Sequence, residues 1–159
     1  MKLINTNEHI KQLRELAQKY EFPLEEIKVV ESIQKWCKER KIEEDNPFRI
    51  GKCLRNQESG KYLILLAAKI TPDMFNSVIS AIESRGYETE VEVLNNPFRF
   101  LAHLLLHEVA HTKNENWSEQ ECDNWAFEEL NYLLHTKNGQ SCKRNSRKLQ
   151  TGIPENCKK

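Results

Sequence analysis

The segment PFRFLAHLLLHEVAH, residues 97–111, constrains the fold of this chain more than any other. It begins at an Asn-Pro pair, which favours a turn followed by the first position of a helix. Its apolar residues then lie almost all round that helix, and a helix of this kind is buried in a protein core. We therefore expect the other elements to pack around this segment.

Length and composition indicate one domain in aqueous solution. The chain has 159 residues, 30% charged and 38% apolar, which is enough for one core and short for two. No apolar run approaches the roughly 20 residues that cross a bilayer, and the first residues lack the apolar core of a secretion signal. A cytoplasmic protein without membrane contact is expected, and in that compartment its five cysteines would be free thiols.

Hydrophobic periodicity predicts an α+β fold with N-terminal helices, a small, mostly antiparallel sheet, and two consecutive C-terminal helices. The first helix contains residues 10–17, and the third is capped by Thr71 with Pro72 at its first position and Gly86 after its end. Helices are predicted over 10–17, 23–41, 72–85, 97–111 and 118–135, and strands over 48–55, 62–68 and 87–94.

The last turn of the apolar segment is His107-Glu108-Val109-Ala110-His111, an H-E-x-x-H pattern. Residues four apart lie on one helix face, so both imidazoles can reach one ion. Zinc accepts neutral imidazole nitrogens at about 2.0–2.1 Å and prefers four tetrahedral partners. Glu108 would stand beside the ion as a general base for its water. The pattern predicts one Zn²⁺ per chain.

Two histidines leave such an ion incompletely bound, so a third ligand is needed. The extended pattern H-E-x-x-H-x-x-G-x-x-H does not occur, because Asn114 and Trp117 occupy the glycine and third-histidine positions. The remaining source is a carboxylate of the following helix, which offers Glu119, Glu121, Asp123, Glu128 and Glu129.

HEVAH followed by EQECDNWAFEEL resembles the ImmA/IrrE-like metallopeptidases and, more broadly, the glutamate-zincins. In those families an E-x-E-A-[DN]-x-[FW]-A stretch supplies the third ligand. On that pattern Glu121 takes the ligand position and Asp123 the acidic position after it. Trp125 and Ala126 match the aromatic–alanine pair, and Cys122 stands where alanine is usual.

The ligand role of Glu121 has a structural alternative. Ser118 followed three residues later by Glu121 is a capping box, in which the glutamate bonds back to the backbone of its own cap. The two roles aim the carboxylate differently, and Glu119 is the alternative ligand. His103, one turn before His107, is a further candidate for a role beside the ion or the substrate.

The resemblance covers residues 98–134 and implies a zincin-like metallopeptidase domain over 1–137. It implies hydrolysis of peptide bonds in a protein substrate, often a transcriptional regulator, with the substrate added as a strand along a sheet edge beside the metal. Residues 87–94 are the predicted edge. A group that stabilises the oxyanion is also needed, and the candidates are Tyr87, Tyr132 and His103.

Residues 138–159 form a predicted flexible basic tail, with six basic residues and one acid, a net charge of +5 against −5 for the rest. The pattern favours a solvated end over a nucleic-acid partner. Two alternative functions stay open. One is a latent peptidase inhibited by this tail. The other is a non-catalytic, metal-stabilised module that binds protein or nucleic acid.

Overall fold

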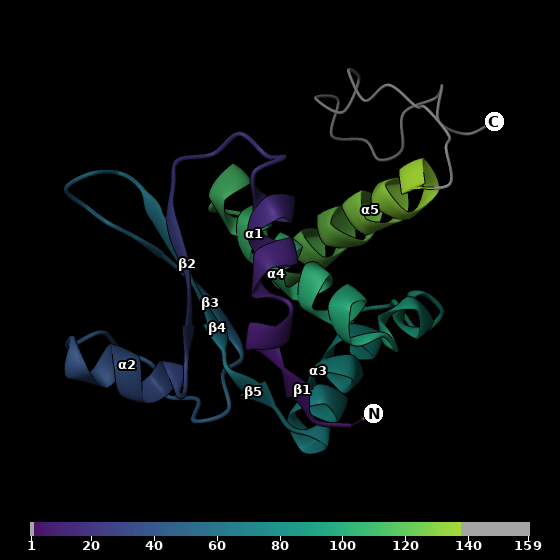
Figure 1. The fold of residues 1–159 in the computed structure, drawn as a ribbon, viewed down its shortest axis with the longest axis horizontal. Coiled ribbons are helices and arrows are strands. Elements are labelled where there is room, and N and C mark those ends of the chain that lie inside the picture. The colour runs from purple at the N-terminus through teal and green to yellow at the C-terminus, as the bar shows by residue number, and fades with distance from the viewer. Residues whose placement is uncertain (1, 138–159) are drawn as a thin grey trace.

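Helix α4 (Pro97–Lys113) runs through the middle of the α+β fold that the computed structural model describes for residues 2–137 (Figure 1). The side chain of Asn96 caps it by accepting a hydrogen bond from the backbone N–H of Arg99, and Pro97 fills the first turn. Every residue from Phe100 to Ala110 is buried, which confirms the prediction of a buried helix here.

A three-stranded sheet lies beside this helix, with β4 (Tyr62–Ala67) between two neighbours. Strand β3 (Gly51–Arg55) pairs with β4 antiparallel, as predicted for this hairpin, whereas β2 (Leu24–Val30) pairs with it parallel. A second, two-stranded antiparallel sheet joins β1 (Ile4–Asn5) to β5 (Lys69–Ile70). The larger sheet is therefore mixed. Within residues 2–137 no strand pairs with the outer edge of β3.

The single helix predicted over 23–41 is wrong. The segment forms strand β2 and then, after a turn, the short helix α2 (Ile33–Glu39). Ser32 is the cap that divides them, since its hydroxyl accepts a hydrogen bond from the backbone N–H of Lys35. The apolar spacing fits both periods, and pairing with the buried strand β4 decides for the strand.

The strand predicted over 87–94 is also wrong, because this segment contains the 3₁₀ helix η2 (Glu90–Leu94). Its buried residues are Val91 and Leu94, three apart, which is the repeat of a 3₁₀ turn. Both belong to the main hydrophobic core. Burial of this three-residue repeat therefore overrides the alternating pattern of valines and glutamates.

The other predicted helices are confirmed as α1 (Ile10–Ala17), α3 (Pro72–Ser84) and α5 (Glu119–Lys137), and η1 (Thr6–Glu8) is an added 3₁₀ turn. Thr71 caps α3, and Gly86 after its end has the positive φ of 105° that favours glycine. Helices α4 and α5 pack against each other, which places the two halves of the predicted site side by side.

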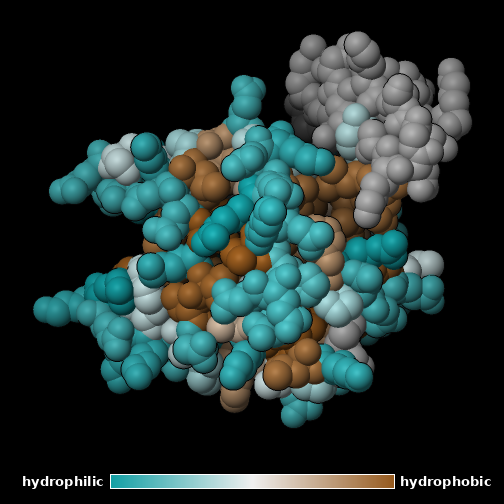
Figure 2. All heavy atoms as spheres, in the orientation of Figure 1, coloured by the Kyte–Doolittle hydropathy of each residue, from teal (hydrophilic) through white to brown (hydrophobic). Residues whose placement is uncertain are grey.

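Hydrophilic side chains cover much of the face seen in Figure 2, and hydrophobic side chains are visible between them. Among the described residues no helix is both long and apolar enough to cross a membrane. Three of the five cysteines, Cys37, Cys53 and Cys122, lie in this part of the chain and are free thiols. The predicted tail, 138–159, lies outside the described residues.

Candidate metal centre

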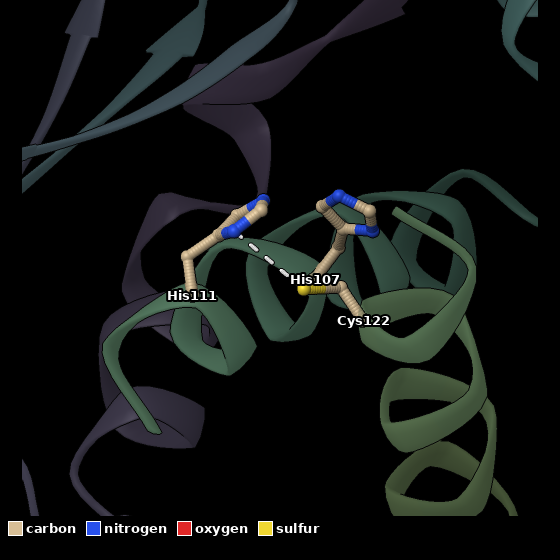
Figure 3. Close-up of side chains that lie close together, drawn as sticks. All are labelled: His107, His111 and Cys122. Atoms are coloured by element: carbon tan, nitrogen blue, oxygen red, sulfur yellow. Dashed lines mark hydrogen bonds between the residues drawn. The ribbon is translucent and has the colours of Figure 1, made fainter. Parts of the chain in front are cut away.

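The two histidines of the H-E-x-x-H pattern lie next to each other at the interface of α4 and α5. Their ring centroids are 5.1 Å apart and the rings are inclined by 75°. His107 is 8% exposed, and His111 is half-buried. Figure 3 shows both imidazoles beside Cys122, which comes from α5. The helix therefore presents two imidazoles on one face, as their spacing predicts.

The carboxylate of Glu119 lies against both imidazoles. Its Oε1 is 3.0 Å from Nε2 of His107, and its Oε2 is 3.4 Å from Nε2 of His111. Two ligands of a tetrahedral zinc with bonds of 2.0–2.1 Å are separated by about 3.3–3.4 Å. The two distances from Glu119 oxygens to the Nε2 atoms are therefore close to the distance between two ligands of one zinc ion.

Glu121 has a different role in this structure, because its carboxylate closes the capping box at the start of α5. The backbone N–H of Ser118 donates to Oε1 of Glu121 over 2.8 Å, and the N–H of Glu121 donates to the Ser118 hydroxyl over 3.1 Å. The carboxylate brought to the histidines is that of the alternative residue, Glu119. The signal for it was in the sequence, since Glu119 and Asp123 are four apart and so share one face of α5.

Asp123 holds His107 from the opposite side of the ring. Nδ1 of His107 donates to Oδ1 of Asp123 over 2.7 Å, and Nη1 of Arg85 donates to Oδ2 over 2.5 Å. Asp123 is buried, so both interactions are shielded from water. A carboxylate on Nδ1 fixes the tautomer that leaves Nε2 available to a metal.

The carboxylates make this pocket attractive to a cation. Burial disfavours the imidazolium form of His107, but the hydrogen bonds with Asp123 and Glu119 outweigh that effect and raise its pKa to about 10. The same histidines lower the pKa of Glu119. A positive charge, either a proton or a divalent ion, is therefore stabilised between these groups.

Cys122 completes a group of three side chains that could hold a metal ion. The ligand atoms of His107, His111 and Cys122 all lie within 4.8 Å of one another. Sγ of Cys122 is 3.5 Å from Nδ1 of His111, and burial raises the pKa of this thiol to about 12. The sequence pattern identified Cys122 only as a small residue where alanine is usual, so its contact with His111 was missed.

Glu108 lies one residue beyond His107 and points toward strand β3. It is 6% exposed, and a Cβ atom added to Gly51 would lie 3.1 Å from its Oε2. Burial raises the pKa of Glu108, so this carboxylate holds a proton more readily than an exposed one. The glycine is what lets the strand approach this carboxylate.

His103 lies one turn before His107 but does not belong to the metal-binding group. Its Nε2 is buried without a hydrogen-bond partner among the described residues and is 3.8 Å from Oδ1 of Asp123. Desolvation lowers the pKa of His103 to about 3, so the ring is neutral. It packs on Phe127 with ring centroids 4.4 Å apart.

Two cavities meet at Glu108 and Glu119. One of about 410 Å³ lies along β3, and the other, of about 240 Å³, lies between α3 and α4. Tyr62, which the sequence did not single out, lines the larger cavity, and its hydroxyl donates to Glu115 over 2.8 Å. Tyr87, an oxyanion candidate, donates instead to the backbone oxygen of Gln120. The site is therefore reached from two sides.

No model of a protein family, no curated protein and no solved structure matches this chain. What can be inferred about its function rests on the residues and on their geometry.

Proposed function

We propose that this protein is a zinc metallopeptidase in which His107, His111 and Glu119 bind the ion and Glu108 is the general base. The observation that carries the proposal is the position of Glu119, whose two oxygens lie 3.0 and 3.4 Å from the Nε2 atoms of the two histidines. Three protein ligands and one open position are typical of catalytic zinc. The zinc, when bound, supplies an acidic water and polarises the substrate carbonyl.

The residues around the ion then have separate roles. Asp123 orients His107 through Nδ1, so that Nε2 faces the ion. Glu108, buried and directed at the shared wall of the two cavities, takes the proton of the attacking water and returns it to the leaving amine. The pKa of Glu108 is raised by burial, which brings its proton affinity closer to that of the amine.

Strand β3 is the sheet edge that a peptide would use, in place of residues 87–94. Gly51 and Cys53 of this strand line the larger cavity together with Glu108 and His111. The outer edge of β3 pairs with no described strand, so its backbone groups are available to an added chain. The sequence resemblance to ImmA/IrrE-like enzymes adds the expectation that the substrate is a protein, such as a transcriptional regulator.

A comparison of two neighbouring glutamates tests the ligand set. Glu119→Ala removes a carboxylate from the site, and Glu121→Ala removes the one in the capping box. We expect metal analysis to give one zinc per chain in the wild-type protein and in Glu121→Ala, and a large loss in Glu119→Ala. Zinc lost from Glu121→Ala and kept by Glu119→Ala would refute this ligand set.

Glu108→Gln tests catalysis, because it keeps the size of the side chain and removes the base. The variant should bind zinc with wild-type affinity and lose cleavage of a denatured protein or a mixed peptide library by a factor of about 10² or more. Equal cleavage by both proteins would exclude the mechanism.

A second candidate is a non-catalytic, metal-stabilised binding module, which the His107–His111–Cys122 group favours, since two of its three side chains are buried. Such a module would bind a metal without any cleavage that depends on Glu108.

Truncation after Asn138 examines the remaining alternative, a latent peptidase, since removal of an inhibitory tail would raise the rate of cleavage.

A further inference from the structure

We propose that Cys122 positions His111 for metal binding, with its sulfur accepting the Nδ1–H of the ring and leaving Nε2 to the ion. The proposal rests on the function proposed above, because it assumes that Nε2 of His111 is a zinc ligand. It gives a task to a residue that stands where the resembling families carry alanine. Cys122 is a positioning residue in this scheme and touches neither substrate nor water.

The two imidazoles are held in the same way by helix α5. Each Nε2 faces Glu119, and each Nδ1 faces one of two consecutive residues of that helix. Asp123 Oδ1 is 2.7 Å from Nδ1 of His107, and Cys122 Sγ is 3.5 Å from Nδ1 of His111. A ring whose Nδ1 is engaged presents Nε2 in a fixed direction, which is how residues behind a metal site raise its affinity.

The side on which the sulfur lies argues against its being a ligand itself. In Figure 3 the dashed line joins Cys122 to one ring nitrogen of His111, which is Nδ1. The other nitrogen, Nε2, is the one that has Glu119 beside it. The sulfur thus contacts the nitrogen of His111 that stays free of metal when Nε2 binds the ion.

The strength of the contact sets the size of the effect. Sulfur is a weak acceptor compared with a carboxylate. Among the described residues, Arg85 reinforces Asp123, and no cation bonds to Cys122 in the same way. We therefore expect His111 to be the less rigidly held of the two imidazoles. Loss of residues behind a metal typically costs 10–100-fold in affinity, and for Cys122 we expect the lower end.

The experiment compares zinc affinity, by competition with a chelator, in the wild-type protein, Cys122→Ala, Cys122→Ser and Cys37→Ala. Cys37 is the matched control, since its thiol is also fully buried but lies in a separate hydrophobic cluster with Ile33 and Leu65. Cys122→Ala should bind zinc about tenfold more weakly, and Cys122→Ser should recover part of the loss because a hydroxyl also accepts from Nδ1–H. Cys37→Ala should keep the wild-type affinity.

Two spectroscopic measurements on the wild-type protein complete the test, so that it does not depend on the variants folding. Nitrogen NMR of the zinc form should show His111 protonated at Nδ1 and metal-bound at Nε2. The cobalt form should lack the thiolate-to-cobalt charge-transfer band. If the wild-type cobalt form shows that band and Cys122→Ala loses it, Cys122 is a ligand and the proposal is wrong. Unchanged zinc affinity in Cys122→Ala, or a metal bound to Nδ1 of His111, would also overturn it.

These readouts are separate from catalysis. A protein that binds zinc in this way but cleaves no peptide would refute the proposed peptidase function and leave the role of Cys122 standing. A peptidase that binds zinc equally well without the thiol would do the reverse. A wild-type protein that binds no zinc would refute both.

Discussion

Gly51→Ala is expected to lower both stability and catalysis, although alanine normally improves on glycine in such a position. Gly51 is not among the glycines with positive φ, so alanine meets no backbone strain there. By restricting the unfolded chain, the change alone would stabilise the protein by about 0.4–1 kcal/mol. Any destabilisation must therefore come from contacts of the added methyl group.

The structure gives those contacts. The new Cβ would lie 2.8 Å from Cδ1 of Leu104 and 3.1 Å from Oε2 of Glu108. Carbon atoms pack best at about 3.5–4.0 Å, so the methyl group overlaps Leu104 by roughly 0.7 Å or more. The strand cannot easily withdraw, because Gly51 is paired with Leu66 in the ladder of β3 and β4. Leu104 and Glu108 must move instead.

Overpacking of this kind costs about 1–3 kcal/mol. After the gain of about 0.4–1 kcal/mol from the restricted unfolded chain, a net loss of about 1 kcal/mol remains, and a chain of this size should then lose about 2–4 °C in Tm. Displacement of Glu108 by about 1 Å should lower kcat by up to about 10²-fold. Zinc affinity should stay close to that of the wild-type protein, because none of the three proposed ligands is among the nearest contacts of the added atom.

Thermal unfolding, zinc titration and peptide cleavage would be measured together. Gly60→Ala is the control. Its φ of 74° predicts a loss of about 1 kcal/mol from backbone strain, but the added Cβ would meet only Nη2 of Arg55, at an ordinary 3.9 Å. That variant should lose stability and keep its catalytic constants. A Gly51→Ala protein that is more stable than wild type and fully active would refute the reasoning.

Three further outcomes are expected. Asp123→Asn removes the charge that holds His107 and leaves Arg85 without its carboxylate, so zinc affinity should fall about 10–100-fold in a chelator competition, and an unchanged affinity would exclude the positioning role. Chelation of the metal should lower the Tm by an amount that grows with the zinc concentration of the reference sample, as linkage requires; a Tm independent of zinc would argue against a bound ion. Burial alone would raise the pKa of Glu44, but hydrogen bonds from Lys52, from the backbone of Asn46 and from Arg49 lower it below 4.5. The ionised Glu44 therefore stabilises the fold above pH 4.5, and this stabilisation is lost as the pH falls through the lower pKa of the folded state. Glu44→Gln should therefore cost about 1 kcal/mol in urea unfolding at pH 7, and the difference should vanish in acid; a difference that persists at low pH would contradict this assignment.

Elements with local signals could be predicted from the order of residues alone. The cap at Thr71, the start of α4 after an Asn-Pro pair and the apolar run of α4 depend on neighbouring residues, and each occurs where it was predicted. The placement of His107 and His111 on one face is equally local, because it follows from helical spacing alone. In the same way Ser118 and Glu121 are three residues apart, so the capping box could be predicted from their spacing.

Other features depend on residues that are distant in the sequence, and they could be found only in the folded chain. Residues 24–30 become a strand because β4 pairs with them, and residues 90–94 become a 3₁₀ turn that buries Val91 and Leu94. The position of Glu119 beside the histidines is of this kind. Glu119 and Glu121 are both in the first turn of α5, and only the packing of α5 on α4 turns one of them toward the histidines. The contact of Cys122 with His111 has the same origin, because a side chain's partner on another helix is set by packing and leaves no periodic trace in the sequence.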